Sequence, residues 1–328
     1  MTPATPVLPV ALTCGEPAGI GAELAVKARA ALGAAVPFVW IGDPAHLPPG
    51  TACHEVSTPQ DAAGVAAGVL PVLRHDFAAP ALPGRPDPAN AQGVIDVIAR
   101  AVALVQGGLA SAVCTLPIHK KALQDGAGFG FPGHTEYLAH LAGGADVVMC
   151  LASDVLRVVP ATIHIPLAQV PQALTPAVLE RVIRVTEAGM RRDFGLAAPR
   201  IAVAGLNPHA GEGGAIGHEE TDWIGPLVAR LAAEGMDVRG PLPADTMFHA
   251  RARAGYDVAV CAYHDQALIP IKTLAFDEGV NVTLGLPFVR TSPDHGTAFD
   301  IAGLGVAEAG SVIAALRMAH AMAAARQR

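Results

Sequence analysis

The chain has 328 residues, of which 52% are hydrophobic and only 16% charged, and its formal net charge is −7. This charge balance excludes a basic nucleic-acid-binding surface, and the apolar segments are interrupted too often to span a membrane. The first residues lack the pattern of a signal peptide, and the five scattered cysteines include no C-x-x-C pair. We therefore expect a cytoplasmic protein without nucleic-acid or membrane partners, whose cysteines are mostly buried.

Short apolar runs rich in Val, Ile and Ala alternate along the chain with longer segments of helical period. This alternation is typical of parallel strands joined by crossover helices and predicts an α/β fold. The predicted strands are, in order, VLPVALT, PFVWIGD, SAVCTLP, DVVMCLA, LRVVPATIHI, RIAVAGLN, DVAVCAYH and GVNVTLGLP. The predicted helices cover residues 19–31, 89–106, 176–194, 219–234 and 307–326. The pattern predicts no structure for the connection 44–88.

The first polar segment of interest is FPGHTEYLAHLAG, in which a Pro-Gly turn precedes His134 and Thr135 and an amphipathic helix follows. An imidazole and a hydroxyl beside the free N–H groups of a helix amino terminus can bind an anion. The alternative is that Thr135 only caps the helix.

Three histidines occur at or just after predicted strand ends, in ATIHIP, GLNPHAG and CAYHDQ. Ligands of α/β sheets bind at the carboxyl ends of strands, and three imidazoles would hold a divalent metal while leaving positions open for a substrate. The candidate ligands are His164, His209 and His264. The alternative is that each is an ordinary hydrogen-bonded histidine near the core.

The glycine-rich segment GEGGAIG matches neither G-x-G-x-x-G nor the P-loop pattern. Glu219 and Glu220 are expected in the first turn of the next helix, where carboxylates would compete with a bound phosphate. A structural turn or a metal-carrying loop is therefore favoured. Farther on, Lys272, Asn281 and Arg290 stand in apolar surroundings, where the two cations need anionic partners, either protein carboxylates or a ligand.

Together these segments resemble the 4-hydroxythreonine-4-phosphate dehydrogenase family of pyridoxal phosphate biosynthesis. The resemblance is carried by LTCGEPAGIGAEL, IGDP, LPIHKKAL, FPGHTEYLA, NPHAGEGGAIGHEE, PADTMF, YHDQALIPIK and VNVTLGLPFVRTSPDHGTAFDIAG, in this order. It implies a two-domain α/β fold like that of isocitrate and isopropylmalate dehydrogenases. The first domain would comprise residues 1–130 and 275–328, and the second, with the metal ligands and dimer interface, residues 131–274. It also implies a homodimer with active sites at the subunit interface.

The resemblance further implies roles for individual residues. His164, His209 and His264 would bind the metal, which is zinc, cobalt or magnesium in this family. DHGTAFDIAG is similar to an adenosine-binding segment of the wider superfamily, so NAD or NADP would contact His295, Gly296, Thr297 and Asp300. Asp245 and Asp265 are candidates for the general base or for groups that orient a ligand. The residues that would contact the substrate are His134, Thr135, Lys272, Asn281 and Arg290.

The reaction implied is the NAD(P)-linked oxidation of 4-phosphooxy-L-threonine to 2-amino-3-oxo-4-(phosphooxy)butanoate, which decarboxylates to 3-amino-2-oxopropyl phosphate. Two alternatives to this function remain, another substrate and another class of enzyme. The substrate could be another compound oxidised by relatives, D-erythronate 4-phosphate or an aromatic dihydrodiol. The protein could instead be a phosphate acyltransferase of the same superfamily, although such an enzyme would not need three histidines at strand ends.

Overall fold

The computed structural model describes residues 7–327, which divide into two compact units. Unit 1 is the chain up to Ala145 together with the segment from Leu286 onward, and unit 2 is Asp146–Gly285. The predicted two-part α/β architecture is confirmed, but the expected boundaries at 130/131 and 274/275 differ from these. As a result His134 and Thr135 belong to unit 1, and Asn281 belongs to unit 2.

Unit 1 contains a sheet in which all strand pairs are parallel. The two short strands at one edge arise from the connection 44–88, for which the sequence pattern predicted nothing. The strand order is β3 (Cys53–Glu55), β4 (Leu70–Arg74), β2 (Phe38–Gly42), β1 (Val10–Thr13), β5 (Val113–Thr115) and β12 (Arg290–Pro293).

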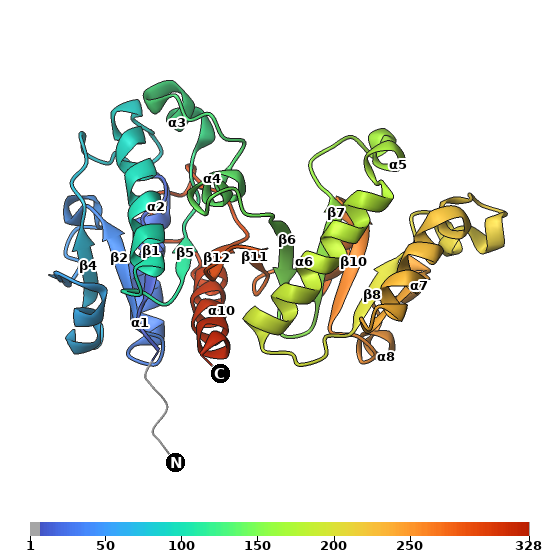
Figure 1. Ribbon diagram of the computed structural model, residues 1–328. Helices are drawn as coiled ribbons and strands as arrows, with labels where there is room; N and C mark the ends of the chain where they lie inside the picture. The colour runs from blue at the N-terminus through green and yellow to red at the C-terminus, as the bar shows by residue number, and fades with distance from the viewer. Residues whose placement is uncertain (1–6, 328) are drawn as a thin grey trace, which may run out of the picture. The chain divides into compact units, whose positions relative to one another are not determined.

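The helices α1, α2 and α10 pack on this sheet, and α3 and α4 pack on α2 (Figure 1). Within residues 7–327, α2 with its preceding turn is the single helix long and apolar enough to cross a membrane, but its apolar side packs against β1 and β5. Its apolar character is therefore explained by the core. The helical elements are α1 (Gly21–Leu32), η1 (Pro44–His46), η2 (Pro59–Gly64), η3 (Pro88–Asn90), α2 (Ala91–Gln106), α3 (Lys120–Ala127), α4 (His134–Leu141) and α10 (Gly310–Arg326).

Unit 2 contains a mixed sheet. The prediction of parallel strands holds for β7, β10 and β8 but is wrong for β6 and β11, because β11–β6 and β6–β7 pair antiparallel. The strand β9, which was not predicted, pairs parallel with β8. The order is β11 (Val280–Leu284), β6 (Val148–Ala152), β7 (Arg157–Thr162), β10 (Val258–Tyr263), β8 (Ile201–Ala204) and β9 (Val238–Leu242).

The helices of unit 2 include α6, which lies in front of β6 and β7 in Figure 1 and has the limits predicted from sequence. The Thr175 hydroxyl accepts a hydrogen bond from the Val178 N–H at its start, and Gly195 ends it in the left-handed conformation. The helical elements are η4 (Leu167–Gln169), α5 (Val170–Ala173), α6 (Pro176–Phe194), η5 (Pro208–Gly214), π-helical η6 (Glu220–Ile224), α7 (Gly225–Ala233), η7 (Ala244–Thr246), α8 (Ala250–Arg253) and α9 (His264–Leu274).

The core of unit 2 fixes the position of α9. Ala267, Leu268 and Ile271 of this helix share a buried cluster with Val158 of β7 and Cys261 of β10. Cys261 is one of four buried cysteines, and all five cysteines are free thiols, Cys53 being exposed. Because α9 begins directly after β10, its packing determines where its first residue, His264, points.

Candidate active site

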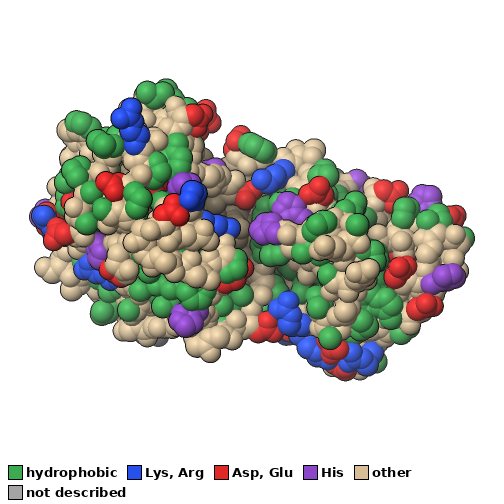
Figure 2. Space-filling view, turned by 90° about the horizontal axis from the view of Figure 1, so that it is seen from above, with side chains coloured by type: hydrophobic (Ala, Val, Ile, Leu, Met, Phe, Trp, Pro, Cys, Tyr) green, Lys and Arg blue, Asp and Glu red, His purple; other side chains and the backbone are tan. Residues whose placement is uncertain are grey.

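The carboxyl ends of β7, β10 and β8 lie side by side at one end of the unit 2 sheet because these strands are parallel neighbours. Tyr263 is in register with Thr162, so His264 and His164 follow the ends of adjacent strands. Figure 2 views the molecule from above, the side on which α5 lies in Figure 1, and histidine side chains reach the surface there. This end of the sheet is the place where an α/β sheet binds its ligands.

The structure brings His164 and His264 together. Their ring centroids lie 5.7 Å apart, and both rings line a cavity of about 230 Å³ with apolar walls that include Ile165 and Leu167. The Nδ1 atom of His264 lies 2.7 Å from Oδ1 of Asp265, so the ring is held through Nδ1 and its Nε2 remains for a ligand. Asp265 therefore orients His264.

His209 does not join these two histidines within one chain. Among residues 7–327, no three His, Cys, Asp or Glu side chains are grouped closely enough to hold a metal ion. His209 is largely exposed, and its Nδ1 lies 3.7 Å from Oε2 of Glu212. The three predicted ligands thus appear as one pair and one separate histidine.

His164 and His209 share an unusual backbone conformation. Each has φ of 52°, in the left-handed region that side chains with a Cβ rarely adopt. Such strain costs on the order of 1–3 kcal/mol and is concentrated at functional sites. Two of the three candidate ligands therefore lie on strained backbone.

The loop that carries His209 is folded around Glu220. The buried Glu220 carboxylate accepts hydrogen bonds from the backbone N–H of Asn207 at 2.7 Å and from its Nδ2 at 2.9 Å, and Glu219 accepts a second bond from Nδ2 at 2.7 Å. The expectation that Glu219 and Glu220 begin the next helix is confirmed, because helical residues run without a break from Glu219 into α7. The first turn, from Glu220, is π-helical. These carboxylates hold the loop.

Gln266 joins two of the strand ends and was missed from sequence. Its Nε2 donates to the carbonyl of Gly205 at 2.8 Å, and its Oε1 accepts from the N–H of Ala262 at 2.6 Å. The amide thereby links the His209 loop after β8 to the His264 turn after β10. The segment YHDQ could have indicated this role, because a Gln just after a strand end can donate to one neighbouring strand end and accept from another.

Lys272 lies on α9, two helical turns after His264. Both residues line a second cavity of about 390 Å³, and Lys272 Nζ lies 5.9 Å from the ring centroid of exposed Phe276. Asn281 lies on β11, and its buried Oδ1 has no hydrogen-bond partner in the described part of the chain. Asn281 thus has an acceptor available for a donor group.

In unit 1, His134 and Arg290 form a separate polar group. Burial lowers the pKa of His134 well below its ordinary value, and the nearby Arg290 and Lys120 lower it further. Its Nε2 has no hydrogen-bond partner among residues 7–327. Burial also lowers the pKa of Arg290 to about 10, so its guanidinium stays charged at neutral pH, and its Nη2 donates to the Thr115 hydroxyl at 2.7 Å.

Thr135 is the second residue of α4 and not its cap. The N-cap position belongs to Gly133, and no side chain caps the helix. The capping alternative for Thr135 is therefore wrong, and the first N–H groups of α4 stand next to His134.

The predicted cofactor segment follows β12 in unit 1. His295 Nδ1 lies 2.9 Å from the carbonyl oxygen of Gly296, and its buried Nε2 has no partner among the described residues. Space beside the Cα of Gly296 is open, while the Thr297 carbonyl accepts a hydrogen bond from Ile20. Asp300 is exposed. The segment thus presents one unpartnered buried nitrogen and an open glycine.

Asp245 and Asp265 differ in their surroundings. Asp265 contacts His264, as described above, whereas exposed Asp245 lies on η7, which packs against the His209 segment η5. Each acidic residue thus accompanies a candidate metal ligand.

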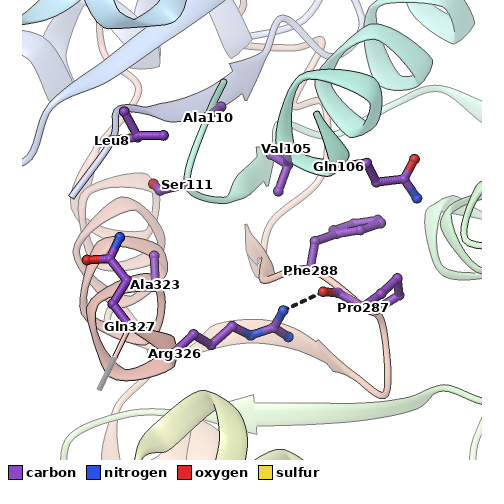
Figure 3. A pocket seen from close by; sticks show the side chains of 10 residues that line it. All are labelled: Leu8, Val105, Gln106, Ala110, Ser111, Pro287, Phe288, Ala323, Arg326 and Gln327. Atoms are coloured by element: carbon purple, nitrogen blue, oxygen red, sulfur yellow. Dashed lines mark hydrogen bonds between the residues drawn. The ribbon is translucent and has the colours of Figure 1, made fainter. Parts of the chain in front are cut away.

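Another cavity, of about 410 Å³, lies at the amino ends of strands β1 and β5 in unit 1 (Figure 3). Leu8 and Ser111, which precede β1 and β5, line it, and Arg326 donates across it to the carbonyl of Pro287 at 2.7 Å. The amino ends of parallel strands are not where such sheets bind substrates. None of the predicted site residues lines this cavity.

Comparison with known proteins gives the same family as the sequence motifs. The family model described as "Pyridoxal phosphate biosynthetic protein PdxA" matches residues 31–319. A Paracoccus denitrificans protein named 4-hydroxythreonine-4-phosphate dehydrogenase is 69% identical over 326 residues, which cover 98% of this chain and 100% of that protein.

Two solved structures resemble this chain over almost its whole length. The crystal structure of 4-hydroxythreonine-4-phosphate dehydrogenase from Klebsiella pneumoniae is 40% identical, with a TM-score of 0.90, covering 97% of this chain and 98% of that one. A terephthalate 1,2-cis-dihydrodiol dehydrogenase from Burkholderia xenovorans is 29% identical, with a TM-score of 0.67 and coverage of 96% and 98%. The likeness is thus greater to the first enzyme than to the second.

Proposed function

Because the chain belongs to the PdxA family of pyridoxal phosphate biosynthetic proteins, we propose that it catalyses the NAD(P)-linked oxidation of 4-phosphooxy-L-threonine. The match over almost the whole length of a 69% identical relative of that name is the observation that carries the proposal. An aromatic dihydrodiol is the less favoured substrate, since the dihydrodiol dehydrogenase is only 29% identical.

The histidine pair fits a divalent metal such as zinc, cobalt or magnesium. His264 is held by Asp265 with Nε2 remaining, and His164 faces the same cavity from a strained backbone. When bound, the metal supplies a positive charge that lowers the pKa of the substrate hydroxyl. His209 is the expected third ligand, and in the homodimer that we propose, the second copy of the chain would contribute it.

The substrate carries a phosphate and a carboxylate, which need cationic partners. Lys272 and Arg290 supply them, and Arg290 can offer two parallel N–H donors. His134 is neutral at physiological pH, so it acts as a hydrogen-bonding group rather than as a charge. Asn281 and Thr135 add an amide and a hydroxyl. These residues would fix the hydroxyl-bearing carbon in place.

The cofactor segment fits a nicotinamide nucleotide. His295 has a buried nitrogen without a partner, Gly296 leaves room for close approach, and Thr297 and Asp300 complete the segment. NAD or NADP, when bound, accepts the hydride. The product, 2-amino-3-oxo-4-(phosphooxy)butanoate, is a β-keto acid and loses carbon dioxide to give 3-amino-2-oxopropyl phosphate. We expect the protein to act in the cytoplasm.

The test supplies purified protein with 4-phosphooxy-L-threonine, NAD or NADP, and zinc, cobalt or magnesium. We expect reduced cofactor to appear, measured by absorbance, together with carbon dioxide release. Parallel reactions contain D-erythronate 4-phosphate or an aromatic dihydrodiol. Turnover with one of these compounds alone would refute 4-phosphooxy-L-threonine as the substrate but not the dehydrogenase activity. Absence of cofactor reduction with all of the compounds would refute the dehydrogenase activity.

A further inference from the structure

Glu16 is a buried carboxylate that the roles assigned above do not use. It lies in the loop after β1, is only 4% exposed, and forms no ion pair with a cation in the described part of the chain. Burial raises the pKa of this carboxyl group, while a hydrogen bond from the Ala18 N–H to Oε1, at 3.1 Å, opposes the shift. A buried carboxylate with a single hydrogen bond is costly unless other donors reach it.

The Glu16 loop lies between two groups of candidate residues in unit 1. On one side, the Glu16 N–H donates to the carbonyl of Pro117 at 2.8 Å, two residues after Thr115, which accepts from Arg290. On the other side, the Ile20 N–H donates to the carbonyl of Thr297 at 3.2 Å. The loop therefore adjoins both a substrate candidate and the cofactor segment.

The approach of the loop to the cofactor segment is close. A Cβ on Gly19 would lie 2.9 Å from the Thr297 carbonyl oxygen, and a Cβ on Gly15 would lie 2.6 Å from that of Pro117. Gly15 also has φ of 70°. These two glycines let the chain carry Glu16 between its neighbours, a position that no larger residue would allow without displacing them.

We infer that Glu16 contacts the cofactor, and that its carboxylate accepts hydrogen bonds from the ribose hydroxyls or carboxamide of the nicotinamide riboside half. The inference rests on the proposed dehydrogenase function. Carboxylates are suited to this task because paired ribose hydroxyls offer donors to a fixed acceptor. We assign Glu16 to the nicotinamide riboside half because this half of NAD lies between the reacting carbon of the substrate and the adenosine. The Glu16 loop likewise lies between a substrate candidate and the cofactor segment.

The test is a binding titration of the purified full-length protein with NADH and with ADP, which lacks the nicotinamide riboside. Glu16→Gln keeps a carbonyl oxygen for the Ala18 N–H but replaces the other acceptor with a donor. We expect the Kd for NADH to rise about 10- to 100-fold and the Kd for ADP to stay unchanged. Glu23→Gln, another buried carboxylate of unit 1 that accepts from Ala307 and Lys27, serves as the matched control.

Glu16→Asp keeps the charge on a shorter side chain, and its loss of NADH affinity should be smaller than that of Glu16→Gln. Unchanged NADH affinity in Glu16→Gln would overturn the inference. So would a parallel loss of ADP affinity in both variants, because it would mean that the loop only has a structural role. If the unaltered protein binds neither nucleotide, the proposed function fails, and this outcome is distinct from the other two.

Discussion

The imidazole rings of His164 and His264 lie 5.7 Å apart because β7 and β10 are parallel neighbours in register. If both bind one metal, His164→Ala or His264→Ala should abolish stoichiometric metal binding and lower kcat/KM by at least about 100-fold. Asp265→Asn, which keeps the side-chain shape, should weaken metal affinity about 10- to 100-fold. Metal content of the purified variants measures both effects. His218→Ala, on the exposed part of the His209 loop, is the control, and full metal content in His264→Ala would refute the assignment.

The separation of His209 from this pair predicts a site shared between two copies of the chain. His209→Ala and His264→Ala should each be inactive alone. When the two variants are co-expressed, half of the dimers would be mixed and each would hold one intact site, so about a quarter of the normal activity should return. Mixed dimers isolated with two different tags should have about half the activity of the unaltered dimer, because one of their two sites is intact. Absence of any recovery would indicate that all three ligands come from one chain.

Two neighbouring glycines of the His209 loop offer a matched pair. Both have positive φ, but a Cβ on Gly211 would lie 2.7 Å from Glu220 Oε2, whereas a Cβ on Gly213 would meet nothing within 4 Å. Gly213→Ala should therefore cost only about 1 kcal/mol of backbone strain and keep metal affinity. Gly211→Ala should displace Glu220 and lower metal affinity at least about tenfold. Equal metal affinities in the two variants would contradict a positioning role of Glu220.

The lowered pKa of His134 predicts a pH dependence of stability. An unfolded histidine has a pKa of about 6.5, so between this value and the lower folded pKa the unfolded chain binds more protons. The free energy of unfolding should therefore fall as the pH drops below about 6.5. His134→Asn should weaken this fall without removing it, because burial also lowers the pKa of His75 and His320. Denaturant melts across the pH range test this, with His140→Asn on the same helix as control. An unchanged slope in His134→Asn would refute it.

Arg29 is expected to stabilise unit 1 without contributing to catalysis. This 3% exposed side chain donates to four backbone carbonyls, which its removal would leave without these donors. Arg29→Met should lower the free energy of unfolding by about 2–4 kcal/mol while NADH affinity stays unchanged. Arg74→Met, which removes an exposed ion-paired arginine, should change stability little. A Tm of Arg29→Met equal to that of the unaltered protein would refute this role. The four carbonyls belong to Gly33, Val65, Ala66 and Val69.

Much of the fold could be predicted from the apolar pattern, and the exceptions have physical reasons. The limits of α6 were predicted because Thr175, Pro176 and Gly195 mark them. The antiparallel direction of β11 was not, since a run such as VNVTL has the same pattern whichever way its neighbour runs. The strands β3, β4, β9 and β12 were missed because Pro and Gly interrupt or flank their apolar residues.

The candidate site could be predicted as a set of residue types but not as a set of contacts. Strand ends indicated His164 and His264, which the parallel pairing brings together. The role of Glu220 in holding its own loop was hidden, because a carboxylate near a helix start has the same sequence signature whether it faces the helix or the preceding loop. Contacts between two copies of a chain produce no recognisable spacing of residues in its sequence. The separation of His209 from His164 and His264 within one chain could therefore not be predicted.

If His164 and His209 bind the metal as proposed, their left-handed backbone means that stability and activity make opposite demands on the same two positions. Glycine or asparagine would adopt φ of 52° more readily, so either substitution would relax the chain while deleting an imidazole. A library selected for heat resistance alone would therefore tend to lose these histidines. Engineering of a more robust enzyme should hold both positions fixed and seek its gains in the surface loops of unit 1.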